Sequence, residues 1–270
     1  MSFSDQAGQS IDQSVNDLMS LPVIHPDWEG VPLHVQGFCT TRIGGFSKAP
    51  YDDGQGGGGN NLGDHVGDSP ESVSRNRHML NRFLPDDVTF LSQVHGTIVL
   101  DAATLCAGDN GDAVITTAPN MVCAVLTADC LPVLFSDDKG KVVAAAHAGW
   151  RGLAGGVLQN TVSKMRDAGA DNIIAWMGPA IGPDEFEVGQ DVVDAFQLRA
   201  RTSEKFFKQK TEEGKYLADI YGLARYVLAK AGVNQVYGGD RCTVTEKGQF
   251  YSYRRDGVTG RMASLIWIVP

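Results

Sequence analysis

The chain has 270 residues, of which 43% are hydrophobic and 20% are charged, with a formal net charge of -9. This length suits one large domain or two small ones, with a substantial core. The acidic balance argues against nucleic acid or an anionic membrane as the main partner, since both select for basic patches. It leaves room for a small anionic ligand, because a few arginines in a cleft can bind phosphate.

The N-terminal segment shows none of the features of a targeting sequence. Residues 1–20 are polar, without a basic start or an apolar core, so we expect no signal peptide. No stretch approaches the roughly 18 to 20 apolar residues that span a bilayer. The 5 cysteines are scattered without a CxxC pair, which favours reduced thiols. We therefore expect a cytoplasmic protein.

The first third of the chain predicts few regular elements. We expect residues 1–30 to form a tail and lead-in, and 31–270 to form one catalytic domain. Residues 35–40 predict a short strand, and the turn-rich stretch 44–68 contains a glycine run that we interpret as a surface insertion. Ser69 and Pro70 predict the start of a helix that runs to about Phe83. Residues 88–94 predict a strand.

The rest of the chain alternates apolar runs with helical patterns. Strands are predicted at 121–126, 131–135, 142–146, 173–177, 236–237, 250–253 and 263–269. Helices are predicted at 153–168 and 219–231, each followed by a glycine. Hairpins mixed with isolated helices favour an α/β domain with a mixed sheet.

Three apolar segments share one design, in which a predicted strand leads to a reactive residue beside glycine or proline. These residues are His95, Cys130 and His147. Strand ends can bring distant side chains to one point, and catalytic residues are often found there. Two histidines and a thiolate suit zinc, and three protein ligands leave a fourth position for water or substrate. The spacing itself matches no standard zinc signature.

Nearby polar residues extend this candidate site. Asp129 precedes Cys130 and can act as a general acid or base, or orient a histidine. Arg42 and Arg151 lie in glycine-flanked turns, where a guanidinium can clamp an anion. The remaining cysteines and His25, His34 and His78 are interpreted as ordinary core or surface residues.

From Gly37 to the C-terminus the sequence resembles the YfiH family, long labelled multicopper polyphenol oxidoreductases or laccases and now linked to purine nucleosides. The resemblance rests on the segments 40–45, 61–63, 76–77, 93–96, 127–132, 147–152, 178–182 and 240–243. It implies a layered α/β fold with mixed sheets flanked by helices, related to toxin domains that use a Cys–His pair. Residues 54–60 depart from the family pattern, in which this insertion is absent.

The resemblance also implies the site. His95, Cys130 and His147 would bind zinc, with copper as an alternative metal, and Arg42 would belong to the same site. We expect Cys130, His147, Asp129 and Arg42 to be catalytic. Asn61, Gln93 and Arg151 are expected to bind substrate.

The leading functional hypothesis is a zinc-dependent purine nucleoside phosphorylase that also deaminates adenosine. Its partners would be phosphate and adenosine, inosine or methylthioadenosine, with no nucleic acid or membrane, in a monomer or small homo-oligomer.

Three other hypotheses remain open. The first is a cysteine hydrolase, with Cys130 as nucleophile and His147 as base, acting on amide bonds of cell-wall precursors. The second is copper-dependent oxidation of phenols, disfavoured because the chain has only 6 histidines. The third is a metal- or partner-binding protein without activity, which would give an open coordination position no purpose.

Overall fold

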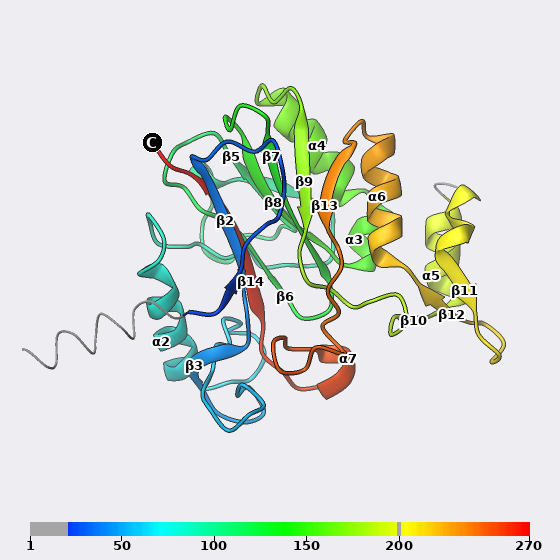
Figure 1. Cartoon of the computed structure of the whole chain (residues 1–270), viewed down its shortest axis with the longest axis horizontal. Coiled ribbons are helices and arrows are strands. Elements are labelled where there is room, and N and C mark those ends of the chain that lie inside the picture. Colours follow the sequence, from blue (N-terminus) through cyan, green and yellow to red (C-terminus); the bar gives the residue numbers. More distant parts are fainter. Residues whose placement is uncertain (1–20, 199–200) are drawn as a thin grey trace, which may run out of the picture.

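The core is a pair of β-sheets stacked face to face, with helices on both outer sides (Figure 1). This computed structural model describes residues 21–198 and 201–270. The predicted α/β sandwich with mixed sheets is confirmed. Of the predicted tail and lead-in, residues 1–20 lie outside the described residues, and Val23–Ile24 form the first strand.

The first sheet joins the beginning of the described chain to its end. Its order is β1 (Val23–Ile24), β2 (Val35–Thr40), β14 (Met262–Ile268) and β6 (Cys123–Thr127), antiparallel throughout. The second sheet has the order β13 (Gln235–Gly238), β9 (Ile173–Met177), β7 (Leu131–Asp137), β8 (Val143–Ala148), β5 (Ala113–Thr116) and β4 (Val99–Asp101). It is mixed, because the pairs β13–β9 and β4–β5 are parallel and the others antiparallel.

Helices cover the two outer faces of this pair. The six-stranded sheet packs against α3 (Trp150–Gly155), α4 (Val157–Asp167) and α6 (Ile220–Lys230), and the four-stranded sheet packs against α2 (Pro70–Asn81). The other elements are β3 (Ile43–Ser47), η1 (Ala102–Thr104), α5 (Gln190–Gln197), η2 (Arg201–Phe206), α7 (Tyr253–Asp256), and a small sheet of β10 (Glu187–Gly189), β12 (Lys215–Ala218) and β11 (Phe207–Gln209).

Strand β8 shows why the central strands are apolar along their whole length. Ala144 and Ala146 pack toward the helices, whereas Val143 and Ala145 pack toward the other sheet. Successive side chains point to opposite faces of a strand, so a strand between two covered faces has no polar side. Position 147 continues the face of Val143 and Ala145, and this face carries the histidine of the candidate site.

The prediction of a strand at 88–94 is wrong, because the side chain of Gln93 takes the place of backbone hydrogen bonds there. Only Ser92 forms an isolated bridge, to Asn110. The Gln93 amide donates to the Leu126 carbonyl oxygen at 2.7 Å and accepts from the Leu126 N–H at 2.7 Å. Gln93 therefore satisfies the exposed edge of β6, a position that a backbone strand would otherwise take.

Two further predictions about elements need correction. The predicted strand 250–253 is absent, since Tyr253 begins α7 and the Ser252 hydroxyl accepts from the Arg255 N–H at 3.2 Å to cap it. The predicted helix 153–168 is two helices, divided at Gly156, whose φ of 106° does not fit an α-helix. Ser69 precedes α2 as predicted, but its side chain makes no capping hydrogen bond.

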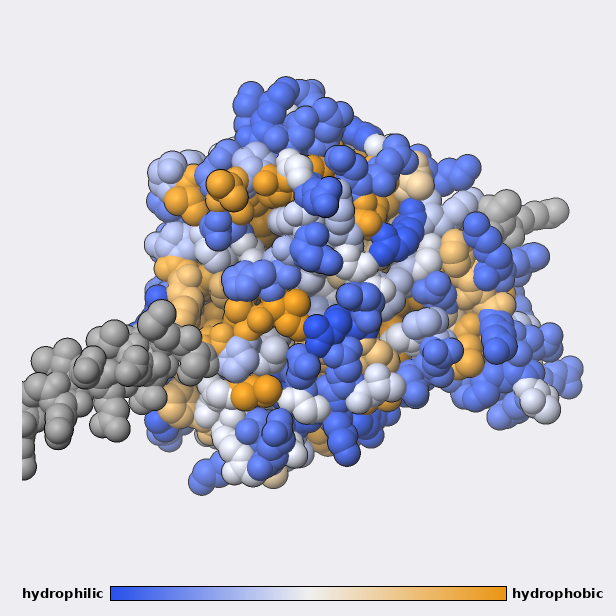
Figure 2. Space-filling view, viewed as in Figure 1, coloured by the Kyte–Doolittle hydropathy of each residue, from blue (hydrophilic) through white to orange (hydrophobic). Residues whose placement is uncertain are grey.

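None of the helices in the described part of the chain is long and apolar enough to cross a membrane. On the face in Figure 2, hydrophobic residues form several separate patches between hydrophilic ones. Residues 54–57 are exposed, as expected of an insertion, but Gly59 is buried, and a Cβ there would lie 2.4 Å from the Tyr251 hydroxyl.

Candidate metal centre

His147 lies near the end of β8 and is held there by Asp112. Its side chain is almost fully buried, and Nδ1 lies 2.8 Å from Oδ1 of Asp112. Its backbone N–H also donates to the Asp112 carbonyl oxygen at 2.7 Å. Because Nδ1 is engaged with the carboxylate, Nε2 is the ring nitrogen left to face the site.

The same carboxylate fixes the loop that carries His95. Asp112 is fully buried, and its oxygens accept from the N–H groups of Val94 at 3.3 Å, His95 at 2.9 Å and Gly96 at 2.6 Å. His95 has a φ of 59°, a left-handed conformation that is uncommon outside glycine. Such conformations persist where surrounding contacts impose them, often at functional sites. The sequence prediction missed Asp112; its one signal is an acid directly before an apolar strand.

Cys130 occupies the turn between β6 and β7, just before β7 begins. Asp129, beside it, has a φ of 85° and is 9% exposed. Its carboxylate accepts from the Thr243 hydroxyl at 2.5 Å and from the Arg254 N–H at 2.6 Å. The turn is thus tied to two segments near the C-terminus. Cys130 therefore lies directly before a strand, whereas the sequence prediction placed it at the end of one.

The three predicted donors converge in the structure. Their ligand atoms all lie within 4.8 Å of one another, and Sγ of Cys130 is 3.8 Å from Nε2 of His95. The two imidazole rings are nearly perpendicular, at an interplanar angle of 76°. Tetrahedral zinc with one sulfur and one nitrogen ligand holds those two atoms about 3.6 Å apart. The group could therefore hold a metal ion, and Asp112 is the carboxylate that orients His147, as carboxylates do for histidines that bind metals.

Gly149 keeps the space beside the three donors open. A Cβ at this position would lie 3.0 Å from Sγ of Cys130, 3.0 Å from Cδ2 of His95 and 3.6 Å from Cε1 of His147. Any other residue would push a methyl group or more against the donors. The glycine after β8 is therefore part of the site's geometry.

Without a metal, the donors form a charged pair. Burial alone would raise the pKa of the Cys130 thiol, but the charge of His147 and hydrogen bonds from both histidines outweigh it and lower the pKa to about 6. Burial opposes charge on His147 too, yet Cys130 and Asp112 raise its pKa to about 9. Burial of Asp112 is outweighed by His147 and the loop N–H groups, which lower the pKa of its carboxyl. A thiolate is the form that binds a metal.

A pocket of about 240 Å³ adjoins the donors. Two of the donors, His95 and Cys130, belong to its wall. The other lining residues are Ala128, Asp129, Trp150, Arg151, Ile181, Phe186, Ile220, Tyr253 and Arg254. Two of these are cations, Arg151 over the Trp150 ring at 4.4 Å and Arg254, whose Nη1 donates to the Glu187 carbonyl oxygen at 3.0 Å. The pocket thus combines aromatic walls with two guanidinium groups.

Three other predicted site residues lie in structural contacts instead. Arg42 is 6% exposed and donates to the carbonyl oxygens of Asp52 and Lys247. Asn61 is buried and bonds the backbone of Gly63 and Arg261. Gln93 pairs with β6, as described above. The pocket wall contains none of the three, whereas Arg151 and Asp129 belong to it.

The fold and this group together define an α/β sandwich that carries a three-donor His–Cys–His site able to hold a metal ion. The chain belongs to the family described as multi-copper polyphenol oxidoreductase laccase, whose model matches residues 36–269. The predicted resemblance is thereby confirmed.

Relatives with a name and relatives with a structure agree with this assignment. The chain is 51% identical over 251 residues to the purine nucleoside phosphorylase YfiH of Escherichia coli, covering 92% of this chain and 99% of the relative. It is 49% identical to a purine nucleoside phosphorylase of Haemophilus influenzae, with the same coverage. A Neisseria meningitidis crystal structure aligns with a TM-score of 0.84 at 49% identity over 92% of this chain and 99% of that one. YlmD of Geobacillus stearothermophilus aligns with a TM-score of 0.78 at 31% identity over 92% and 100%.

Proposed function

We propose that this protein is a zinc-dependent purine nucleoside phosphorylase with a secondary adenosine deaminase activity. The observation that carries the proposal is that His95 and Cys130 of the His–Cys–His group line a pocket with aromatic walls and two arginines. The names of relatives at about 50% identity support the same activity. The nucleoside substrates would be adenosine, inosine or methylthioadenosine.

The donor set fits zinc by the chemistry of its ligands and by the distance between their atoms. Imidazole and thiolate are ligands that zinc prefers, and three protein ligands leave one position for a further oxygen. When bound there, zinc supplies a Lewis acid that polarises an oxygen and lowers the pKa of water. Copper is the other metal that this donor set suits.

The residues of the pocket supply binding and orientation for phosphorolysis. In that reaction an oxygen of phosphate bonds to the anomeric carbon, and the purine leaves with the electrons of the broken bond and takes up a proton. Arg151 and Arg254 bind the phosphate, since a guanidinium matches its geometry bidentately. The rings of Trp150, Phe186 and Tyr253 offer faces for the purine. This role falls to Arg254 rather than Arg42, whose donors are taken up by carbonyl groups.

Asp129 contributes by position. Both of its oxygens already accept short hydrogen bonds from Thr243 and Arg254. The carboxylate therefore holds Arg254 and the Cys130 turn in one arrangement, instead of transferring a proton.

A specific observation favours a second candidate, a cysteine hydrolase. The arrangement resembles a catalytic triad: Cys130 would be the nucleophile, His147 the base and Asp112 the acid that orients the base. The pKa of the Cys130 thiol is lowered to about 6. This activity would need no metal, and its substrate would be an amide.

One experiment separates the two candidates. Purified zinc-loaded protein is incubated with adenosine and phosphate, and adenine, ribose 1-phosphate and inosine are measured by chromatography. We expect adenine and ribose 1-phosphate in equal amounts, with inosine as a minor product and no adenine when phosphate is omitted. Failure to form either adenine or inosine would contradict the proposal. An amide hydrolase that tolerates chelators but is abolished by thiol alkylation would establish the second candidate.

A further inference from the structure

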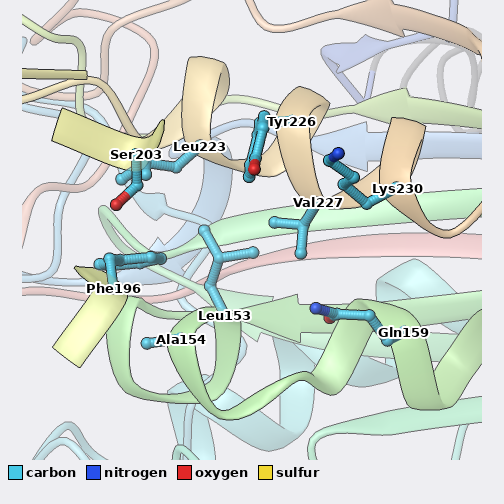
Figure 3. Close-up of a pocket in the computed structure, with 9 residues that line it drawn as sticks. All are labelled: Leu153, Ala154, Gln159, Phe196, Ser203, Leu223, Tyr226, Val227 and Lys230. Carbon is cyan, nitrogen blue, oxygen red and sulfur yellow. The ribbon is translucent and has the colours of Figure 1, made fainter. Parts of the chain in front are cut away.

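A second cavity, of about 420 Å³, has none of the three candidate metal ligands in its wall (Figure 3). Its lining residues come from α3, the start of α4, α5, η2 and α6. Its middle is apolar, lined by Leu153, Ala154, Phe196, Leu223 and Val227. The volume falls within the range of small-molecule sites, roughly 300 to 1,000 Å³.

The ends of this cavity are polar. In Figure 3, Lys230 and Gln159 lie toward one end of the cavity, on facing walls, and Ser203 lies toward the other end. Oε1 of Gln159 and Oγ of Ser203 are buried without a hydrogen-bond partner in the described structure, and Ser203 is only 2% exposed. Buried polar atoms are normally paired, and leaving them unpaired costs stability.

Lys230 gives the first end a positive charge. Its ammonium group is exposed and forms no ion pair with any described residue, in a protein whose net charge is -9. Its Nζ lies over the ring of Tyr226, 5.8 Å from the ring centroid. An ammonium and an amide at the mouth of an apolar cavity complement a carboxylate, because the amide can rotate to donate beside the ammonium.

We propose that this cavity binds a small amphipathic carboxylate. The apolar body fills the space between Leu153, Phe196 and Val227, and the carboxylate meets Lys230 and Gln159. A hydroxyl at the far end of the molecule would pair with Ser203. This site is separate from the proposed phosphorylase pocket and requires no activity there.

The test is direct binding by calorimetry, with 1-naphthylacetate and its neutral counterpart 1-naphthylacetamide as probes. We expect saturable binding of the acid, with the amide about tenfold weaker because it lacks the charge. Lys230→Gln should weaken binding of the acid by about the same factor and leave the affinity for the amide unchanged. Lys48→Gln, which removes an equal charge from another exposed position, is the matched control and should change neither.

A second variant locates the binding. Ala154→Phe places a ring in the cavity and should abolish binding of both probes, while circular dichroism confirms the fold. Equal affinity for acid and amide, no saturable binding of the acid, or binding that survives Ala154→Phe would each overturn the proposal. None of these outcomes depends on nucleoside turnover, so they leave the proposed function to its own test.

Discussion

At the scale of single residues, Asp112 connects two histidines that lie far apart in the sequence. One carboxylate bonds the ring of His147 and the backbone of the His95 loop. Losing its charge therefore disturbs the direction of one ring and the position of the other. The groups that hydrogen-bond to this carboxylate come from a loop and a strand, so no periodic pattern in the sequence could reveal its role. The three candidate metal ligands, in contrast, stood out by residue type.

We expect Asp112→Asn to lower zinc affinity about 10- to 100-fold, as is usual when the group that orients a ligating histidine is lost. Competition with a chromophoric chelator measures the affinity. The matched control is Asp137→Asn, another fully buried aspartate whose oxygen accepts two backbone N–H groups. Asp137→Asn should lower thermal stability but leave zinc affinity unchanged; equal losses in both variants would contradict the role of Asp112.

Cys130 offers a pH test in the metal-free protein. The pKa of its thiol is lowered to about 6, so the reactive thiolate persists at pH 7 and is lost as the pH falls through 6. Alkylation by iodoacetamide, followed at each cysteine by mass spectrometry, should therefore change little between pH 7 and 9 and slow below pH 6. Burial raises the pKa of Cys39 to about 12, so it should stay unmodified. A Cys130 rate that keeps rising to pH 9 would contradict the thiolate.

At the scale of elements, apolar content predicted most of the buried strands because both of their faces are covered, but it missed β5. Strands β6, β7, β8, β9 and β14 were found within a few residues of their predicted bounds. The same signal failed for 88–94 and 250–253, where the Gln93 side chain and the Ser252 cap decide the structure. The sheet of β10, β11 and β12 was missed, since its short, half-exposed strands have no continuous apolar run.

Gly156 gives a stability test of the break between α3 and α4. Its φ of 106° is unfavourable for a residue with a Cβ, at a cost of about 1–2 kcal/mol. Gly156→Ala should therefore lower the melting temperature by roughly 2–8 °C, given about 2–4 °C per kcal/mol for a chain of this size. Gly156→Asn should lower it less, because asparagine tolerates left-handed conformations better. A stabilised Ala variant would mean that the two helices can merge.

At the scale of the whole molecule, the three candidate metal ligands come from three separate parts of the fold. His95 comes from a loop, Cys130 from the turn before β7 and His147 from β8. A ligand that binds only the folded state stabilises it by about 4 kcal/mol at 1,000 times its Kd. Zinc removal should therefore lower the melting temperature by roughly 8–16 °C.

Scanning calorimetry with and without a chelator measures this shift. Cys130→Ser removes one donor, so its melting temperature should hardly respond to the chelator. If the unmodified protein melts at the same temperature in both conditions, the three donors do not hold zinc in solution.

Helix α3 is only 6 residues long, yet it borders both cavities. Its first residues, Trp150 and Arg151, line the pocket beside Cys130, and Leu153 and Ala154 line the second cavity. The two cavities therefore share one short element of their walls. If a carboxylate bound in the second cavity displaces α3, occupancy of the two cavities is thermodynamically linked: whatever factor the carboxylate imposes on the affinity of a ligand beside Cys130, that ligand must impose on the affinity for the carboxylate.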